Sequence, residues 1–146
     1  MKHYKVGYTA GVYDMFHVGH LNLLKRAKEM CDYLIVAVTT DELAAYKNAK
    51  TVIPFEDRCT IVEAIKYVDK VVPQVDMDKM AAWERNKFDV MFVGDDWKGT
   101  DKWNKLEKDF AEVGVDIVYF PYTKKISSTK LREIIKKDRY KKSRTI

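Results

Sequence analysis

The chain has 146 residues, of which 47% are hydrophobic, 34% are charged and 12% are aromatic, and its formal net charge is +5. This length suits one domain with a single packed core, and the aromatic content excludes a disordered chain. No run is long and apolar enough to span a membrane, and residues 1–14 lack the apolar core of a signal peptide. We therefore expect a cytoplasmic protein whose positive charge indicates an anionic partner: a nucleotide, a nucleic acid or a membrane surface.

We assign residues 1–137 to one domain and residues 138–146 to a basic C-terminal tail, which is typical of a solvated chain end. Two cysteines, Cys31 and Cys59, lie in periodic apolar segments without the close Cys or His spacing of a zinc site. We interpret both as residues in or near the core, and the sequence identifies no protein ligand for a metal ion.

Strand-like and helix-like patterns alternate along the first half of the chain. A short strand at residues 5–10 is followed by a helix whose apolar positions recur at three- and four-residue spacing up to Met30. Residues 33–40 form a β-branched run typical of a strand buried on both faces, and a short helix follows from Asp41. The next helix begins near Pro54, and its apolar face is predicted at Cys59, Ile61, Val62, Ile65 and Val68.

The same alternation continues in the second half of the chain. The pattern predicts further strands and helices, with strands at residues 69–73, 89–94 and 115–120 and helices at residues 78–87, 103–113 and 127–137. The second of these helices is expected to turn three side chains inward, those of Leu106, Phe110 and Val113. This order predicts a Rossmann-like α/β fold, in which helices cover both faces of a doubly wound, five-stranded parallel sheet.

Polar residues cluster directly after four of the five predicted strands. They are Gly11, Asp14, His17 and His20 after the first strand, Thr39, Thr40 and Asp41 after the second, residues 94–97 after the fourth and residues 121–129 after the fifth. Because the carboxyl ends of parallel strands share one edge of a sheet, we expect these segments to meet there. Ligands bind at this edge in folds of this class.

The stretch "AGVYDMFHVGHL" at residues 10–21 holds two of the three histidines in the chain. No P-loop and no dinucleotide-binding fingerprint is present, but the free N–H groups of a helix start also bind phosphate. Gly19 would let a phosphate approach the backbone, and His17 and His20 would lie on one side of the first helical turn. These features favour a phosphate site, although taken singly His20 also suits a core position and His17 a helix cap.

The segment "GVYDMFHVGH" resembles the GxFDxxHxGH signature of the cytidylyltransferases, a family within the HxGH nucleotidyltransferase superfamily. The likeness continues in the same order through "RAKEMCDYLIVAVTTDE", "FEDRCTIVEAIKYVDKVV", "VGDDW" and "ISSTKLRE". It is greatest for the branch that acts on glycerol 3-phosphate, followed by those that act on phosphocholine and phosphoethanolamine. The resemblance implies transfer of CMP from CTP to a phosphorylated alcohol with release of pyrophosphate, Mg²⁺ bound with the CTP, and a homodimer.

The resemblance also implies roles for individual residues. His17 and His20 would stabilise the transition state, and Lys47 would bridge the phosphates of the two substrates. The nucleotide would be bound by Gly11, Val12, Tyr13, Asp14, Gly19, Gly94, Asp95, Tyr122, Thr123, Ile126, Ser127, Ser128 and Thr129. The acceptor would be bound by Lys47, Arg58, Lys66, Asp69 and Trp97. Without the resemblance, Lys47 and Arg58 would be interpreted as solvated, and Trp97 equally well as a core residue.

Four positions depart from the family pattern, one of which is Ala49 in place of a second lysine two residues after Lys47. Tyr122 and Lys66 stand where the family has arginine, and Lys125 stands where it has glycine. Neither tyrosine nor lysine offers the planar, bidentate contact of a guanidinium group. Glycerol 3-phosphate and CTP remain the first expectation, and choline-phosphate or ethanolamine-phosphate transfer and an ATP-using adenylyltransferase remain alternatives. A nucleic-acid-binding module is the alternative from another class, but the chain carries no known nucleic-acid motif, so we expect no nucleic-acid partner.

Overall fold

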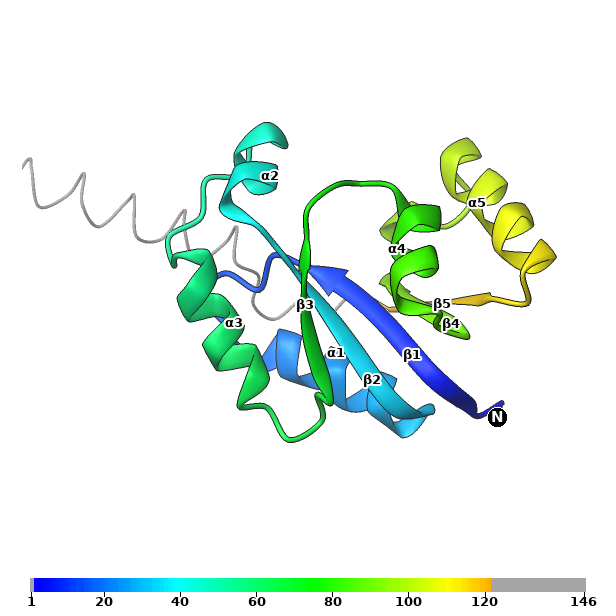
Figure 1. Ribbon diagram of the computed structural model, residues 1–146, viewed down its shortest axis with the longest axis horizontal. Helices are drawn as coiled ribbons and strands as arrows, with labels where there is room; N and C mark the ends of the chain where they lie inside the picture. Colours follow the sequence, from blue (N-terminus) through cyan, green and yellow to red (C-terminus); the bar gives the residue numbers. More distant parts are fainter. Residues whose placement is uncertain (1, 122–146) are drawn as a thin grey trace, which may run out of the picture.

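The computed structural model describes residues 2–121 (Figure 1). The predicted helix at residues 127–137 and the basic tail lie outside these residues. The described part contains one sheet, made of β1 (Tyr4–Gly11), β2 (Cys31–Thr39), β3 (Lys70–Gln74), β4 (Val90–Gly94) and β5 (Asp116–Phe120). Its strands are all parallel and follow the order β3-β2-β1-β4-β5. The predicted Rossmann-like architecture is therefore confirmed.

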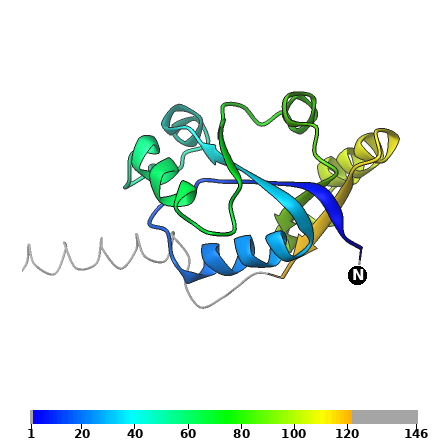
Figure 2. The ribbon, with the colours of Figure 1, turned by 60° about the horizontal axis from the view of Figure 1, so that its bottom comes forward.

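Helices cover both faces of this sheet (Figures 1 and 2). One face packs against α1 (Val18–Glu29) and α3 (Phe55–Glu63), and the other packs against α4 (Lys79–Asn86) and α5 (Asp101–Glu112). Strand β2, which lies between β3 and β1, supplies both cores, because successive side chains of a strand point to opposite faces. Its two sets of buried residues are Leu34, Val36 and Val38 toward α1 and α3, and Ile35 and Ala37 toward α4 and α5.

Hydroxyl and carboxylate caps start helices soon after the strands end. Thr40, Asp78 and Thr100 accept hydrogen bonds from the backbone N–H groups at the starts of α2 (Asp41–Tyr46), α4 and α5. Each cap satisfies one of the N–H groups that a helix start leaves without a partner. The chain therefore turns sharply at the carboxyl edge of the sheet and keeps polar residues there.

The apolar faces of two helices differ from the prediction. Helix α3 ends at Glu63, and Ile61 is 39% exposed, because the buried side of the helix is formed by Arg58 and Val62, four residues apart. Val113 caps the end of α5 and is 37% exposed, since the chain leaves the helix there. Among the described residues, no helix has the length and apolar character needed to cross a membrane.

The strand order places a topological switch point beside β1. This strand pairs with β2 on one side and with β4 on the other. The connections that leave the carboxyl ends of β1 and β4 diverge, since α1 lies on one face of the sheet and α5 on the other. Folds of this type bind ligands in the crevice at such a point.

Candidate active site

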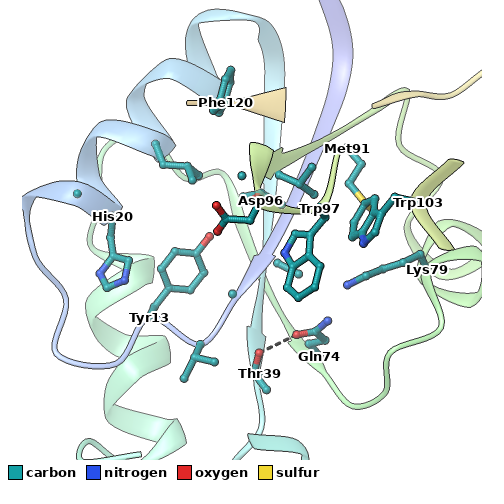
Figure 3. A pocket seen from close by; sticks show the side chains of 18 of the residues that line it. Tyr13, His20, Thr39, Gln74, Lys79, Met91, Asp96, Trp97, Trp103 and Phe120 are labelled. Carbon is teal, nitrogen blue, oxygen red and sulfur yellow. Dashed lines mark hydrogen bonds between the residues drawn. The ribbon is translucent and has the colours of Figure 1, made fainter. Parts of the chain in front are cut away.

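A cavity of about 770 Å³ opens at this edge of the sheet. It is lined by the turn between β1 and α1, by the ends of the other four strands, and by the first turns of α4 and α5 (Figure 3). Nine of the predicted site residues line this cavity: Gly11, Val12, Tyr13, His17, Gly19, His20, Lys47, Gly94 and Trp97. The predicted residues from Tyr122 to Thr129 lie outside the described part of the chain.

The two histidines form a reciprocal cap at the start of α1. The backbone N–H of Gly19 donates to Nδ1 of His17 over 3.0 Å, and the backbone N–H of His17 donates to Nδ1 of His20 over 3.2 Å. Because each Nδ1 atom accepts, each neutral ring carries its proton on Nε2. The imidazoles stack with ring centroids 3.9 Å apart. Capping thus uses the Nδ1 atoms and leaves the Nε2–H groups of both rings for other contacts.

The Nε2 atom of His17 is buried and has no hydrogen-bond partner among the described residues. His17 also lines the cavity, so this N–H is a donor that a ligand there can satisfy. Burial lowers the pKa of His17. Burial and the neighbouring His17 ring lower the pKa of His20 to about 4, against a smaller opposing effect of Asp14. Both rings are therefore neutral at pH 7 and act as hydrogen-bond donors rather than as cations.

Tyr13 and Met15 give the turn between β1 and α1 its shape. Their φ angles are 55° and 48°, in the left-handed region that residues other than glycine rarely adopt. The Tyr13 side chain is buried in the core while the residue lines the cavity. Backbone strain of this kind persists only where the surrounding structure enforces it.

Asp14, predicted as a nucleotide contact, does not line the cavity. It is fully buried, and its carboxylate accepts hydrogen bonds from the backbone N–H groups of Val52 and Ile53 over 2.8 and 2.9 Å. The carboxylate thus fastens the segment before α3 to the turn that carries the histidines. The structure thus gives Asp14 a structural role, because a buried carboxylate needs such donors, and its predicted nucleotide contact stays a prediction.

Arg58, predicted as an acceptor contact, is likewise absent from the lining of the cavity. Its side chain is fully buried, and its guanidinium donates to the carbonyls of Val12 and Thr39 and to the Asp41 carboxylate over 2.7, 2.7 and 2.6 Å. It also donates to the Ile53 carbonyl over 2.9 Å. The solvated alternative is wrong because the side chain is buried, and the predicted substrate contact stays a prediction. Arg58 instead ties together the carboxyl ends of β1 and β2, where carbonyls lack strand partners.

Lys66 and Asp69 lie at the opposite end of the sheet. Both precede β3, and residues before a parallel strand lie at its amino end, away from the cavity. Lys66 is exposed and lies over the Tyr67 ring. Asp69 accepts from the backbone N–H of Leu34 over 2.8 Å and pairs with Lys28 over 2.6 Å. The structure places neither residue at the cavity of its own chain, and their predicted acceptor contacts stay predictions.

The segment after β4 presents a different aspartate from the one predicted. Gly94, Asp96 and Trp97 line the cavity, whereas Asp95 does not, although both aspartates are exposed. Residues 95–97 form a short 3-10 helix, and this conformation decides which of two adjacent carboxylates faces the cavity. Trp97 is 57% exposed, so the alternative of core packing is wrong and its ring borders the cavity (Figure 3).

Two lysines in the cavity were not predicted from the sequence. Lys79 and Lys102 line it together with Lys47. Burial, followed by repulsion from Lys47 and Lys102, lowers the pKa of Lys79 to about 8. The sequence feature that could have identified them is their position, because both lysines lie in the first turn of a helix that starts at the carboxyl edge of the sheet. The cavity therefore offers neutral imidazole donors on one side and three ammonium groups, an arrangement suited to phosphate-bearing ligands.

Comparisons with known proteins agree with this chemistry. The family described as cytidylyltransferase-like matches residues 8–134. A relative from Bacillus subtilis named glycerol-3-phosphate cytidylyltransferase is 40% identical over 134 residues, which cover 87% of this chain and 94% of the relative. A relative from Pyrococcus horikoshii named FAD synthase is 35% identical over 136 residues and 88% of each chain. A lipopolysaccharide core biosynthesis protein from Thermoplasma volcanium shares the fold, with a TM-score of 0.70 at 24% identity over 84% of this chain and 99% of that chain.

Proposed function

The chain belongs to the cytidylyltransferase-like family, and we propose that it transfers CMP from CTP to a small phosphorylated alcohol, glycerol 3-phosphate, with release of pyrophosphate. The similarity to relatives named glycerol-3-phosphate cytidylyltransferase supports the choice of substrates. The observation that carries the proposal is the buried Nε2 atom of His17, which has no partner in the described part of the chain. It is a donor that a ligand in the cavity would satisfy.

The proposed reaction needs no protein nucleophile. An oxygen of the acceptor phosphate attacks the α-phosphorus of CTP, the new P–O bond forms in line with the bond to the β-phosphate, and pyrophosphate leaves. Negative charge builds on the oxygens of the transferring group, where the Nε2–H groups of His17 and His20 donate to it. Donors held in place before the reaction typically contribute about 10²–10³ in rate each. The reciprocal cap provides this preorganisation, since it fixes both rings through Nδ1.

Lys47 would hold the two reacting phosphates together. It caps the C-terminal end of α2 and lines the cavity, and burial, followed by repulsion from Lys102, lowers its pKa. Its ammonium group would offset the repulsion between the attacking phosphate and the triphosphate. This assignment comes from the family resemblance, and the position of Lys47 in the cavity supports it.

We propose that Mg²⁺ accompanies the triphosphate of CTP. Among the described residues, no group of three or more His, Cys, Asp or Glu side chains lies together as a potential metal site. Mg²⁺ in nucleotide sites is commonly bound by substrate phosphates and one or two carboxylates. Asp96 supplies one carboxylate to the lining of the cavity and would contact such an ion. The ion would offset phosphate charge.

The second candidate function keeps the reaction and changes the nucleotide. The similarity to relatives named FAD synthase supports an adenylyltransferase, because FAD contains an AMP unit. Tyr122 and Lys125, which replace the arginine and glycine of the family pattern, leave this alternative open. A relative named ethanolamine-phosphate cytidylyltransferase supports another acceptor over a shorter stretch, 63 residues.

The homodimer implied by the resemblance and a cytoplasmic location are also proposals. Light scattering with the full chain would give the mass of the particle in solution. A mass equal to that of one chain would contradict the dimer.

The test of the function is a pyrophosphate-release assay with Mg²⁺ and either CTP or ATP. Glycerol 3-phosphate, phosphocholine and phosphoethanolamine are the acceptors. We expect turnover with CTP and glycerol 3-phosphate, and no turnover with any pair would overturn the proposal.

His17→Asn should lower kcat by about 10²–10³ while the fold persists, because asparagine is also a good helix cap. The matched control is His3→Asn. His3 is exposed, pairs with Asp32 and lies far from the cavity.

A further inference from the structure

Helix α1 forms one wall of the cavity. Gly19, Asn22, Leu23 and Arg26 line the cavity, and their spacing of three and four residues places them on one side of the helix. Arg26 stands seven residues after Gly19, which is about 10 Å along the helix axis. The wall therefore runs from the turn that carries the histidines to the guanidinium group of Arg26.

The ring of Phe120 holds the Arg26 side chain in place. Phe120 ends β5, is 5% exposed, and stacks on Phe92 with ring centroids 5.4 Å apart. The guanidinium carbon of Arg26 lies 4.6 Å from the centroid of the Phe120 ring. A guanidinium group stacked on an aromatic ring keeps its N–H groups, which point outward in its own plane, free to donate. Arg26 therefore presents a planar fork of donors at the cavity.

The charge of Arg26 is not used by the fold. Among residues 2–121, no carboxylate lies within 4 Å of its guanidinium group. Arg58, which supports the strand ends, differs in that it pairs with Asp41 over 2.6 Å. The donors of Arg26 are therefore available to a ligand in the cavity.

The surroundings of Arg26 suit a flat ring better than a phosphate group. Its neighbours in the lining are the apolar side chains of Leu23, Phe120 and Pro121. The ammonium groups that line the cavity lie on other elements, and Figure 3 shows Lys79 well apart from Phe120. Placing phosphate charge against apolar side chains is costly, whereas the faces of a nucleobase pack well against them.

We propose that Arg26 is the residue that reads the base of the nucleotide, and that it selects cytosine over uracil and adenine. The inference rests on the proposed function, because it takes the α-phosphate of CTP as the group held at His17 and His20. The nucleoside then extends along α1 toward Phe120. Cytosine carries two adjacent acceptors, O2 and N3, and one guanidinium group donates to both at once.

The same fork of donors rejects the other two bases. Uracil carries a hydrogen on N3, so this N–H would face a donor and only O2 would accept. In adenine the N6 amino group, a donor, stands beside both N1 and N7, so neither edge offers two adjacent acceptors. Two donors that face each other leave their N–H groups without partners, which is unfavourable. Uracil has the ring size of cytosine, so UTP isolates the hydrogen-bond pattern from the shape of the base.

The test compares CTP with UTP in the pyrophosphate-release assay with glycerol 3-phosphate and Mg²⁺. We expect kcat/KM to be about 10- to 100-fold higher for CTP, the discrimination that one bidentate contact to a base provides. Arg26→Met should bring this ratio toward one, because methionine covers Phe120 without offering donors. Arg26→Lys should do the same, since an ammonium group lacks the planar fork. Lys25→Met is the matched control, since Lys25 is exposed on the same helix and does not line the cavity.

Three results would overturn this assignment. The first is a wild-type ratio near one. The second is an equal rise of KM for CTP and UTP in Arg26→Met with their ratio unchanged, which would assign Arg26 to the triphosphate. The third is a wild-type ratio in Arg26→Lys, which would show that charge alone is sufficient. Both variants are expected to fold, because Arg26 is exposed and has no ion-pair partner in the described chain.

A binding measurement separates this inference from the proposed function. If no acceptor releases pyrophosphate from any nucleotide, the proposed function fails. Calorimetric titration of the full chain with CTP and with UTP, each with Mg²⁺, still tests the role of Arg26. Tighter binding of CTP that is lost in Arg26→Met and in Arg26→Lys would support it, and equal affinities of the wild-type chain for the two nucleotides would overturn it.

Discussion

Replacing Arg58 tests whether this residue positions the active site or binds substrate. The structure gives its guanidinium four partners: the carbonyls of Val12, Thr39 and Ile53 and the carboxylate of Asp41. Arg58→Met would leave all four without this donor. Arg58→Lys would keep the charge, but a single ammonium group cannot reach both sides of the cluster as the planar fork does.

The size of the effect follows from burial. Removing one member of a buried ion pair costs about 3–5 kcal/mol. The Arg58 side chain is fully buried, whereas that of Asp41 is 45% exposed and can regain water. We therefore expect Arg58→Met to lower the free energy of unfolding by about 3 kcal/mol, and Arg58→Lys by about 2 kcal/mol. Both proteins should still fold, because domains are typically stable by about 5–15 kcal/mol.

Activity should fall through displacement of the turn that carries the histidines. Arg58 holds the Val12 carbonyl, and Val12 lies five residues before His17. A shift of about 1 Å at reacting groups can cost 10²-fold in rate. We expect Arg58→Lys to lower kcat by about 10- to 100-fold with little change in KM for the acceptor. Urea unfolding followed by circular dichroism and steady-state kinetics would measure both effects.

A different result would refute this reasoning. If Arg58→Lys keeps its stability within about 0.5 kcal/mol and raises KM for the acceptor, Arg58 binds substrate, as the sequence predicted. The matched control is Arg85→Lys, because Arg85 also faces an aspartate, but at 3.7 Å on the surface. Its stability should change by no more than about 0.5 kcal/mol.

Three further predictions concern His20, Trp97 and Asp14. The unfolded chain protonates His20 below about pH 6.5 and the folded chain only below about pH 4, so stability should fall with decreasing pH by roughly 1.4 kcal/mol per unit across this window. Urea unfolding at several pH values should show a shallower slope for His20→Asn, and equal slopes would contradict the neutral, half-buried ring. Trp97→Ala should raise KM for the acceptor about tenfold in steady-state kinetics but change the unfolding free energy by less than about 0.5 kcal/mol, because the ring is 57% exposed; a large loss of stability would instead indicate core packing. Asp14→Asn should lower stability by about 1–3 kcal/mol and leave KM for CTP unchanged, so a raised KM for CTP with full stability would restore Asp14 as a nucleotide contact.

Much of the fold was predictable because its signals are local. The β-branched run in β2 and the three- and four-residue spacing in α1 each depend on neighbours within one element. The errors at Ile61 and Val113 fall at the ends or sides of helices, where packing decides exposure. The strand order also required tertiary structure, because pairing of β1 with β4 joins segments about 80 residues apart.

The active site likewise has features that the local sequence predicts and features that depend on tertiary structure. The sequence by itself determined that the carboxyl ends of the strands carry polar residues and that two histidines stand at a helix start, because both features depend on spacing within one segment. Only the tertiary structure decided which polar groups face the cavity. It placed Asp96 rather than Asp95 there, buried Arg58 behind the strand ends, and brought Lys79 and Lys102 together from two helices. The physical reason is that burial and electrostatic repulsion act between segments that only folding brings close.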